Sequence, residues 1–118
     1  VFPNIITNKW FIGFSIKGTS GAEIYPDVDI VSDNYFEKNL PNSFTSQSFK
    51  SFVTTKEYSE ITVCGLDLCG CVGATAKGAI KTGMAVTLSE AATGCRFGKE
   101  KANRMKKDLI SLGVKIIK

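Results

Sequence analysis

The chain contains no histidine. This absence excludes a Ser-His or Cys-His catalytic pair built from this chain, and it excludes any metal site that needs imidazole ligands. Long apolar runs are missing as well, since none approaches the ~20 residues of a membrane-spanning helix. The start, Val1–Asn4, lacks both an initiator methionine and the basic-then-apolar pattern of a signal peptide. We therefore expect a chain that is either processed or part of a longer one.

The chain has a moderate number of charged residues, with a small excess of basic over acidic ones. The 118 residues are 22% charged and 43% hydrophobic, with a net charge of +4, which predicts one globular domain over 1–118 rather than a disordered chain. Five basic residues cluster near the C-terminus, but no aromatic residues alternate with them to stack on bases. We interpret this cluster as a solvated helix face, with no nucleic-acid or membrane partner: Lys99, Lys101, Arg104, Lys106 and Lys107.

Cysteines are few but crowded. Cys64, Cys69 and Cys71 fall within eight residues, and Cys95 is distant. The crowded three lack the tight turns of a small secreted disulfide scaffold, so we expect a protein of the reducing cytoplasm. Their spacing comes near a plant-type iron–sulfur pattern but is one residue short. We expect no metal or cofactor, and we interpret Cys64 and Cys95 as small buried hydrophobic residues.

From residue 33 onward, hydrophobic strands alternate with helical segments. The pattern predicts strands at 33–38, 60–65, 84–88 and 114–117, and helices at 45–58, 71–82 and 99–112. Nearly continuous hydrophobic strands separated by helices predict an α/β fold with a mostly parallel sheet and helices on both faces. Such sheets bind ligands at the carboxyl ends of their strands. Lys38 and the turn around Cys71 both fall at such ends.

Cys71 is the candidate nucleophile. It stands where the strand 60–65 gives way to a helix rich in small residues. Unpaired N–H groups and the positive end of the helix dipole favour a thiolate at such a position. The small residues of 73–79 have a purely structural explanation, close approach of helix to sheet, but that explanation does not require a thiol. Lys38 by itself is an ordinary lysine at a strand end.

Three blocks of sequence form a recognisable set. They are the nucleophile stretch with Gly65-Leu66, Cys71-Val72, Thr75-Ala76 and Gly83, the lysine stretch with Phe36–Lys38 and Ser43-Phe44, and the turn-rich Gly18–Glu23. Together, and in this order, they resemble the isochorismatase-like cysteine hydrolases, the superfamily of nicotinamidases and N-carbamoylsarcosine amidohydrolases. Most of residues 10–118 takes part in the resemblance.

The resemblance implies a Rossmann-like three-layer sandwich and a covalent mechanism. The Cys71 thiolate attacks the carbonyl of a small carboxamide or ureido-type substrate, and water hydrolyses the resulting thioester. Backbone N–H groups of Asp67 and Cys71 hold the oxyanion, with a cis peptide at Leu66–Asp67. Lys38 lies near the thiol and favours its ionised form. The resemblance also implies a small-molecule substrate, no cofactor and a homo-oligomer.

The sequence departs from the family pattern in three ways. The first strand, which carries the family's catalytic Asp, has no counterpart, so we expect the domain to be incomplete at its N-terminus. Phe14 stands where nicotinamidases have a metal-binding histidine, which argues against a metal-assisted nicotinamidase. Asp67 replaces a small residue, and its charge opposes a nearby thiolate unless it points away or pairs with Lys38. Trp10 and Phe11 line either a substrate pocket or the core.

Two other functions remain open at this point. A catalytically silent member of the family would serve as a binding or structural subunit with its cysteines buried. An isochorismatase-type hydrolase would cleave a vinyl ether without this cysteine, and the presence of Cys71 favours the amidohydrolase over it.

Overall fold

A computed structural model describes residues 34–118. The chain divides into two compact units, Val1–Asn39 and Leu40–Lys118. In the first unit, residues 34–39 form neither helix nor strand, so the strand predicted at 33–38 is wrong over its described part. The aromatic pair Tyr35-Phe36 favours a strand, but a strand also needs a neighbouring strand to pair with, which no local pattern supplies. The single domain over 1–118 stays a prediction.

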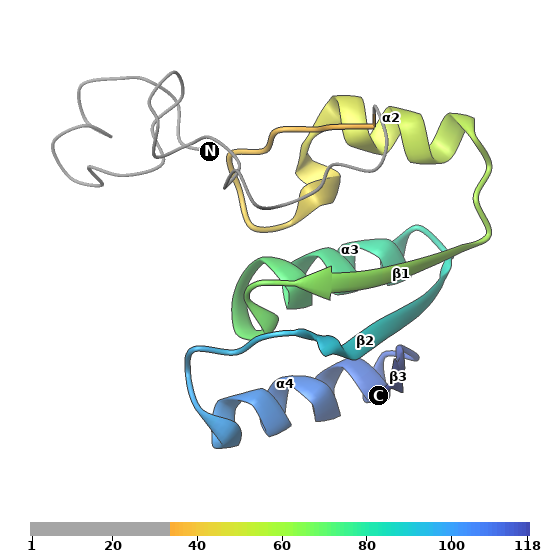
Figure 1. Cartoon of the computed structure of the whole chain (residues 1–118). Coiled ribbons are helices and arrows are strands. Elements are labelled where there is room, and N and C mark those ends of the chain that lie inside the picture. The colour runs from red at the N-terminus through yellow and green to blue at the C-terminus, as the bar shows by residue number, and fades with distance from the viewer. Residues whose placement is uncertain (1–33) are drawn as a thin grey trace, which may run out of the picture. The chain divides into compact units, whose positions relative to one another are not determined.

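The second unit is built on a three-stranded parallel sheet (Figure 1). Its strands are β1 (Glu60–Gly65), β2 (Ala85–Thr93) and β3 (Lys115–Ile117), in the order β1-β2-β3. Helix α3 (Gly73–Lys81) connects β1 to β2, and helix α4 (Lys99–Ser111) connects β2 to β3. Parallel neighbours need such crossover helices. The α/β fold with a parallel sheet is therefore confirmed.

Two short helical turns lead into the main helices. The 3-10 turn η2 (Ser43–Thr45) precedes α2 (Gln47–Thr55), so the helix predicted at 45–58 is shorter and interrupted. The interruption is Ser46, whose backbone is extended, with ψ 114°. The π-helical turn η3 (Leu68–Val72) runs directly into α3.

The core lies between one face of the sheet and its helices. Val63 and Leu88 are register partners on β1 and β2, and both are buried. Helix α4 contributes Leu109, and α3 contributes Ala76 and Ala79, all three fully buried. Small residues on α3 thus allow the close packing that the sequence predicts. Helices α3 and α4 end at Lys81 and Ser111, just before the predicted stops Gly83 and Gly113, which have φ of 87° and 102°.

Cys64 corrects one prediction, because it is exposed rather than buried. Successive side chains of a strand point to opposite faces. Since Val63 faces the core, Cys64 points away from it.

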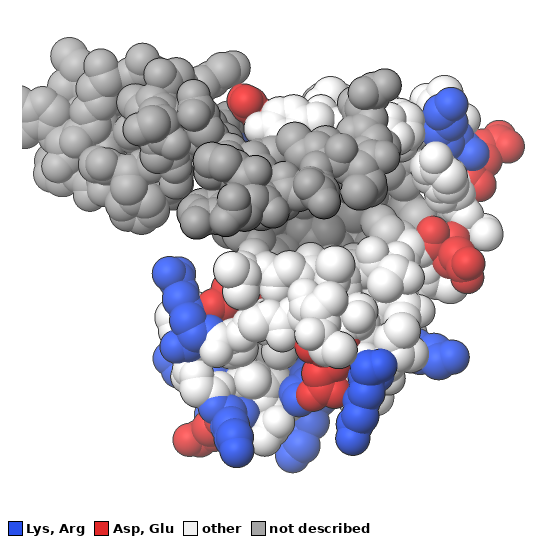
Figure 2. Space-filling view, in the orientation of Figure 1, with Lys and Arg blue, Asp and Glu red and all other residues white. Residues whose placement is uncertain are grey.

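The basic cluster near the C-terminus lies on α4, and in Figure 2 Lys and Arg side chains gather over this part of the molecule. Most of these side chains are exposed, as a solvated helix face requires. Lys106 is half-buried and pairs with Glu90 at 2.6 Å, and its hydrogen bond lowers the pKa of Glu90. Within residues 34–118, no helix has the length and apolar character needed to cross a bilayer.

Candidate active site

Cys71 lies at the carboxyl end of β1, inside the turn η3 that joins this strand to α3. Its side chain is half-buried. It lines a hollow of about 330 Å³ together with Leu66, Asp67, Gly70 and Arg96. Cys71 therefore borders open space and is not part of the packed interior.

The turn η3 begins earlier than the helix start predicted at Cys71. The Asp67 carboxylate accepts a hydrogen bond from the backbone N–H of Cys69 at 3.0 Å, which caps the turn at Leu68. The Asp67 carbonyl accepts hydrogen bonds from the N–H groups of Gly70 and Val72, both at 3.0 Å. The bond to Val72 has the five-residue spacing of a π turn. Regular α-helix begins only at Gly73.

Asp67 is held by the loop that follows β2. Its carboxylate accepts a hydrogen bond from the backbone N–H of Arg96 at 3.0 Å and lies 3.5 Å from the Arg96 guanidinium nitrogen Nε. The hydrogen bond from the Arg96 N–H is the main reason that the pKa of Asp67 is lowered, and the one from Cys69 adds to it. The acidic residue that the sequence marks as a departure is thus an ionised cap bonded to two loops. Sequence reasoning gave Arg96 no role, because no motif includes it.

The elements of the expected oxyanion site share this hollow. Asp67 and Cys71, whose backbone N–H groups the resemblance assigns to the oxyanion, both line it. The peptide bond between Leu66 and Asp67 is cis, which agrees with the conformation that the resemblance implies. The catalytic use of these N–H groups stays a prediction.

The remaining predicted site residues lie in the first unit. Lys38 is half-buried there, and its catalytic role stays a prediction. Trp10, Phe11 and Phe14 lie outside the described residues.

Thr75 attaches α3 to Ser43, in the second part of the lysine stretch. Its hydroxyl oxygen accepts a hydrogen bond from the backbone N–H of Ser43 at 3.0 Å, and it lies 3.0 Å from the Ser43 hydroxyl. Asn42 lies close to Gly78 on the same helix: a Cβ at Gly78 would come within 2.5 Å of the Asn42 side-chain oxygen. The small residues and the threonine of this helix therefore fix residues 42–43 against it.

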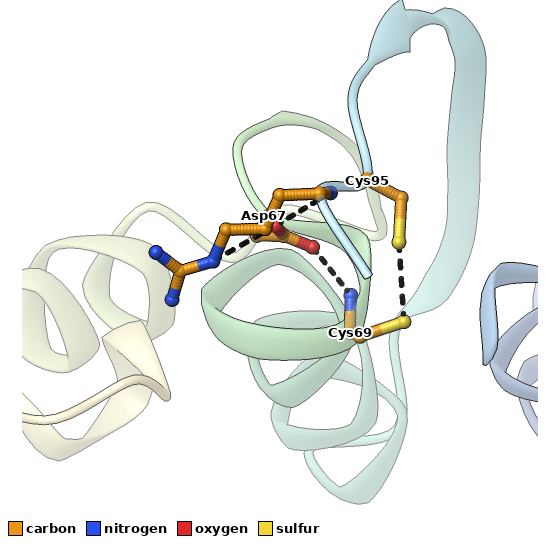
Figure 3. Close-up of polar contacts among 4 residues, drawn as sticks. Asp67, Cys69 and Cys95 are labelled. Carbon is orange, nitrogen blue, oxygen red and sulfur yellow. Dashed lines mark hydrogen bonds and ion pairs between the residues drawn. The ribbon is translucent and has the colours of Figure 1, made fainter. Parts of the chain in front are cut away.

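Cys69 and Cys95 face each other across the same two loops (Figure 3), with their sulfur atoms 3.4 Å apart. Cys95 is half-buried and has a thiol partner, which corrects its interpretation as a buried hydrophobic residue. Burial raises the pKa of the Cys69 thiol, and the neighbouring Cys95 and Asp67 raise it further. One ligand atom from each of Asp67, Cys69 and Cys95 lies within 4.8 Å of the others. The sequence spacing gave no signal of this cluster, because the two thiols are 26 residues apart.

Comparison with known proteins gives consistent matches. The model of the isochorismatase domain matches residues 3–116. No curated protein matches the chain at a significant level.

Solved structures match over most of this chain. They include the pyrazinamidase of Pyrococcus horikoshii in complex with zinc, with 25% identity and a TM-score of 0.71 over 89% of this chain and 61% of that one. The nicotinamidase/pyrazinamidase of Bacillus subtilis has 22% identity and a TM-score of 0.78 over 89% and 62%. The N-carbamoylsarcosine amidase of Thermoplasma acidophilum has 19% identity and a TM-score of 0.78 over 98% and 65%. This chain thus spans less than two thirds of each.

The zinc in the Pyrococcus structure raises the question of a metal here. By the resemblance, Phe14 occupies the position of the metal-binding histidine, and the sequence contains no histidine. A phenyl ring offers no lone pair to a cation. The chain therefore does not supply the imidazole ligand that the family's metal site uses at this position.

Proposed function

This chain belongs to the isochorismatase family, and from that premise we propose that it hydrolyses a C–N bond of a small carboxamide or ureido-type substrate through Cys71. The observation that carries the proposal is the position of the Cys71 side chain. It is half-buried, it precedes α3, and it lines an open hollow at the carboxyl end of a parallel strand. In parallel α/β sheets this end is where ligands bind.

The reaction has two stages. The Cys71 sulfur attacks the substrate carbonyl carbon and forms a tetrahedral oxyanion, which the N–H groups of Asp67 and Cys71 stabilise. The C–N bond then breaks as the nitrogen takes a proton from water, ammonia or an amine leaves together with a hydroxide ion, and a thioester remains on Cys71. Water attacks the thioester, releases the acid and restores the thiol. Lys38 enters this mechanism through the resemblance alone, as its second catalytic residue.

The environment of Asp67 is compatible with this chemistry. Its carboxylate is bonded to the N–H groups of Cys69 and Arg96 and lies near the Arg96 guanidinium. The guanidinium offsets the negative charge of the Asp67 carboxylate, which would otherwise oppose negative charge on the sulfur four residues further along the chain. Asp67 therefore caps the turn that carries Cys71 without leaving an uncompensated charge there.

The proposed substrate class is taken from the names of the structurally similar proteins. Pyrazinamidase and nicotinamidase act on carboxamides, as their names state, and N-carbamoylsarcosine amidase acts on an N-carbamoyl compound. The hollow beside Cys71, at about 330 Å³, is at the small end of the range of ligand sites, about 300–1,000 Å³. A small carboxamide or ureido compound suits that volume.

Two measurements on the full chain test the proposal. The first is turnover: ammonia release is followed with nicotinamide and with N-carbamoyl amino acids, and hydroxylamine added to the same assay traps an acyl thioester as the hydroxamate. Cys71→Ser should lower turnover by about 10³-fold or more, whereas Cys64→Ser, which changes an exposed thiol on the other side of β1, should leave it unchanged.

The second measurement does not depend on finding the substrate. Iodoacetamide at neutral pH should alkylate Cys71 faster than Cys64, although Cys64 is the more exposed thiol. Equal or slower alkylation of Cys71, or turnover that survives Cys71→Ser, would contradict a cysteine nucleophile at this position.

A further inference from the structure

A pair of thiols, Cys69 and Cys95, lies next to the hollow and has no part in the proposed hydrolysis. Cys69 belongs to the turn η3, and Cys95 to the loop between β2 and α4. Their sulfur atoms are 3.4 Å apart, and both side chains are half-buried rather than sealed from solvent (Figure 3). A small reagent can therefore reach two thiols that already touch.

The two loops are bonded to each other on either side of this pair. The Asp67 carboxylate accepts hydrogen bonds from the N–H groups of Cys69 and Arg96, both at 3.0 Å. Backbone hydrogen bonds join Leu68 N–H to the Gly94 carbonyl at 2.9 Å and Gly94 N–H to the Gly65 carbonyl at 3.0 Å. Each thiol is thus carried by backbone that is fixed relative to the other loop.

We propose that Cys69 and Cys95 are a thiol–disulfide modification site, oxidised to an intramolecular disulfide by a small disulfide such as oxidised glutathione. Closing the bond requires the sulfur atoms to move from 3.4 Å to about 2.05 Å apart. Holding the reacting groups together makes the second step intramolecular, and this favours the internal disulfide over a mixed one. The site does not depend on Cys71 being a nucleophile.

The exchange proceeds in two balanced steps. One protein thiolate attacks a sulfur of oxidised glutathione, the glutathione S–S bond breaks, and one glutathione thiolate leaves. The other protein thiolate then attacks the protein sulfur of this mixed disulfide, the Cys69–Cys95 bond forms, and the second glutathione leaves. In total the protein loses two protons and two electrons, and one oxidised glutathione becomes two reduced ones.

The alternative chemistry of this cluster is a soft metal ion bound by Asp67, Cys69 and Cys95. The geometry favours the disulfide for two reasons. The Arg96 guanidinium lies 3.5 Å from the carboxylate and opposes a second cation there. The carboxylate oxygens already accept two backbone N–H groups.

Trypsin separates the two thiols and so makes the test direct. Peptide 57–77 carries Cys64, Cys69 and Cys71, and peptide 82–96 carries Cys95 alone. The reduced full chain is incubated with oxidised glutathione, quenched with acid, alkylated and digested, and the peptides are analysed by mass spectrometry. We expect 57–77 linked to 82–96 in the wild type and in Cys64→Ser and Cys71→Ser, and loss of this link in Cys69→Ser and Cys95→Ser.

Three outcomes would overturn the proposal. They are a link that survives Cys69→Ser, accumulation of mixed glutathione disulfides in place of the link, and thiols that stay reduced. Zinc chloride alone, added to reduced protein, tests the metal. One equivalent of retained zinc that blocks alkylation of both Cys69 and Cys95, together with no cross-link, would assign the cluster to a metal instead.

The same tryptic digests distinguish failure of the disulfide proposal from failure of the hydrolase proposal. Failure of the hydrolase proposal appears as slow alkylation of Cys71 with the cross-link intact. Failure of the disulfide proposal appears as a missing cross-link while Cys71 still reacts rapidly.

Discussion

The carboxylate of Asp67 accepts a hydrogen bond at 3.0 Å from the backbone N–H of Arg96, which lies 29 residues further along the chain. The same carboxylate caps the turn that carries Cys69 and Cys71. One side chain therefore joins the loop after β1 to the loop after β2, and these loops form the wall of the candidate site.

Asp67→Asn should change how stability depends on pH. The pKa of Asp67 is lowered in the folded chain, so the ionised carboxylate stabilises the fold. This contribution is fully present above the carboxyl's unfolded pKa of about 3.9 and is lost as pH falls through the lowered folded value. Urea unfolding should show the wild type more stable than the variant at pH 7, with the difference shrinking below pH ~4. A difference that is equal at pH 7 and pH 2.5 would contradict this role.

Thr75→Val should destabilise the contact between α3 and residues 42–43. The Ser43 N–H loses the oxygen that accepts its hydrogen bond at 3.0 Å, and an unsatisfied buried donor costs about 1–3 kcal/mol. Thr54→Val is the matched control, because the Thr54 hydroxyl is exposed and bonds only to its own helix. The control should change the free energy of unfolding by at most about 0.5 kcal/mol. Equal effects in denaturant titrations would show that the Ser43 bond contributes nothing.

The sequence was sufficient for most of the second unit because its signals are local. The strand at 60–65 and the helix stops at Gly83 and Gly113 follow from β-branched runs and from glycines that take positive φ. The strand predicted at 84–88 is observed at Ala85–Thr93. The prediction stops too early because the residues after Leu88 have no strand pattern of their own. They belong to the strand because β2 pairs with β1 and β3.

The candidate site was predicted only in part. Cys71 was marked by its place between strand and helix, and it lines a hollow as such a residue should. The bonds from Asp67 to the loop of Arg96 and the contact of Cys69 with Cys95 connect positions 29 and 26 residues apart. Such pairings depend on how two loops meet in space, and no spacing along one chain encodes them.

Leu109→Ala tests the core that holds the sheet to α4. Leu109 is fully buried, and truncating such a leucine costs about 2–5 kcal/mol. Ile110→Ala changes the neighbouring, 58% exposed residue of the same helix and should cost well under about 1 kcal/mol, since little apolar area is lost. Both are measured by urea unfolding of the full chain. If Ile110→Ala lowered the free energy of unfolding as much as Leu109→Ala, the core would not lie on the Leu109 face of α4.

The rate of cross-linking between Cys69 and Cys95 should rise with pH. Burial, Cys95 and the Asp67 charge raise the pKa of the Cys69 thiol, and Lys101 opposes them only weakly. Since the thiolate is the attacking species, the rate should increase between pH 7 and 9, by up to about tenfold per unit. Acid-quenched time courses with oxidised glutathione measure it. A rate that is flat over this range would show that thiol ionisation does not limit the reaction.

The close packing of Gly78 on α3 against Asn42 restricts the residues that homologues can carry at these two positions. A single added methyl group there would strike the Asn42 amide, and Asn42 also caps η2 through the Phe44 N–H at 2.9 Å. Alanine at position 78 would therefore displace the Asn42 amide and weaken its cap of η2, and a compensating change is expected at residue 42 rather than along α3. Homologues with alanine at one position should carry a smaller side chain at the other.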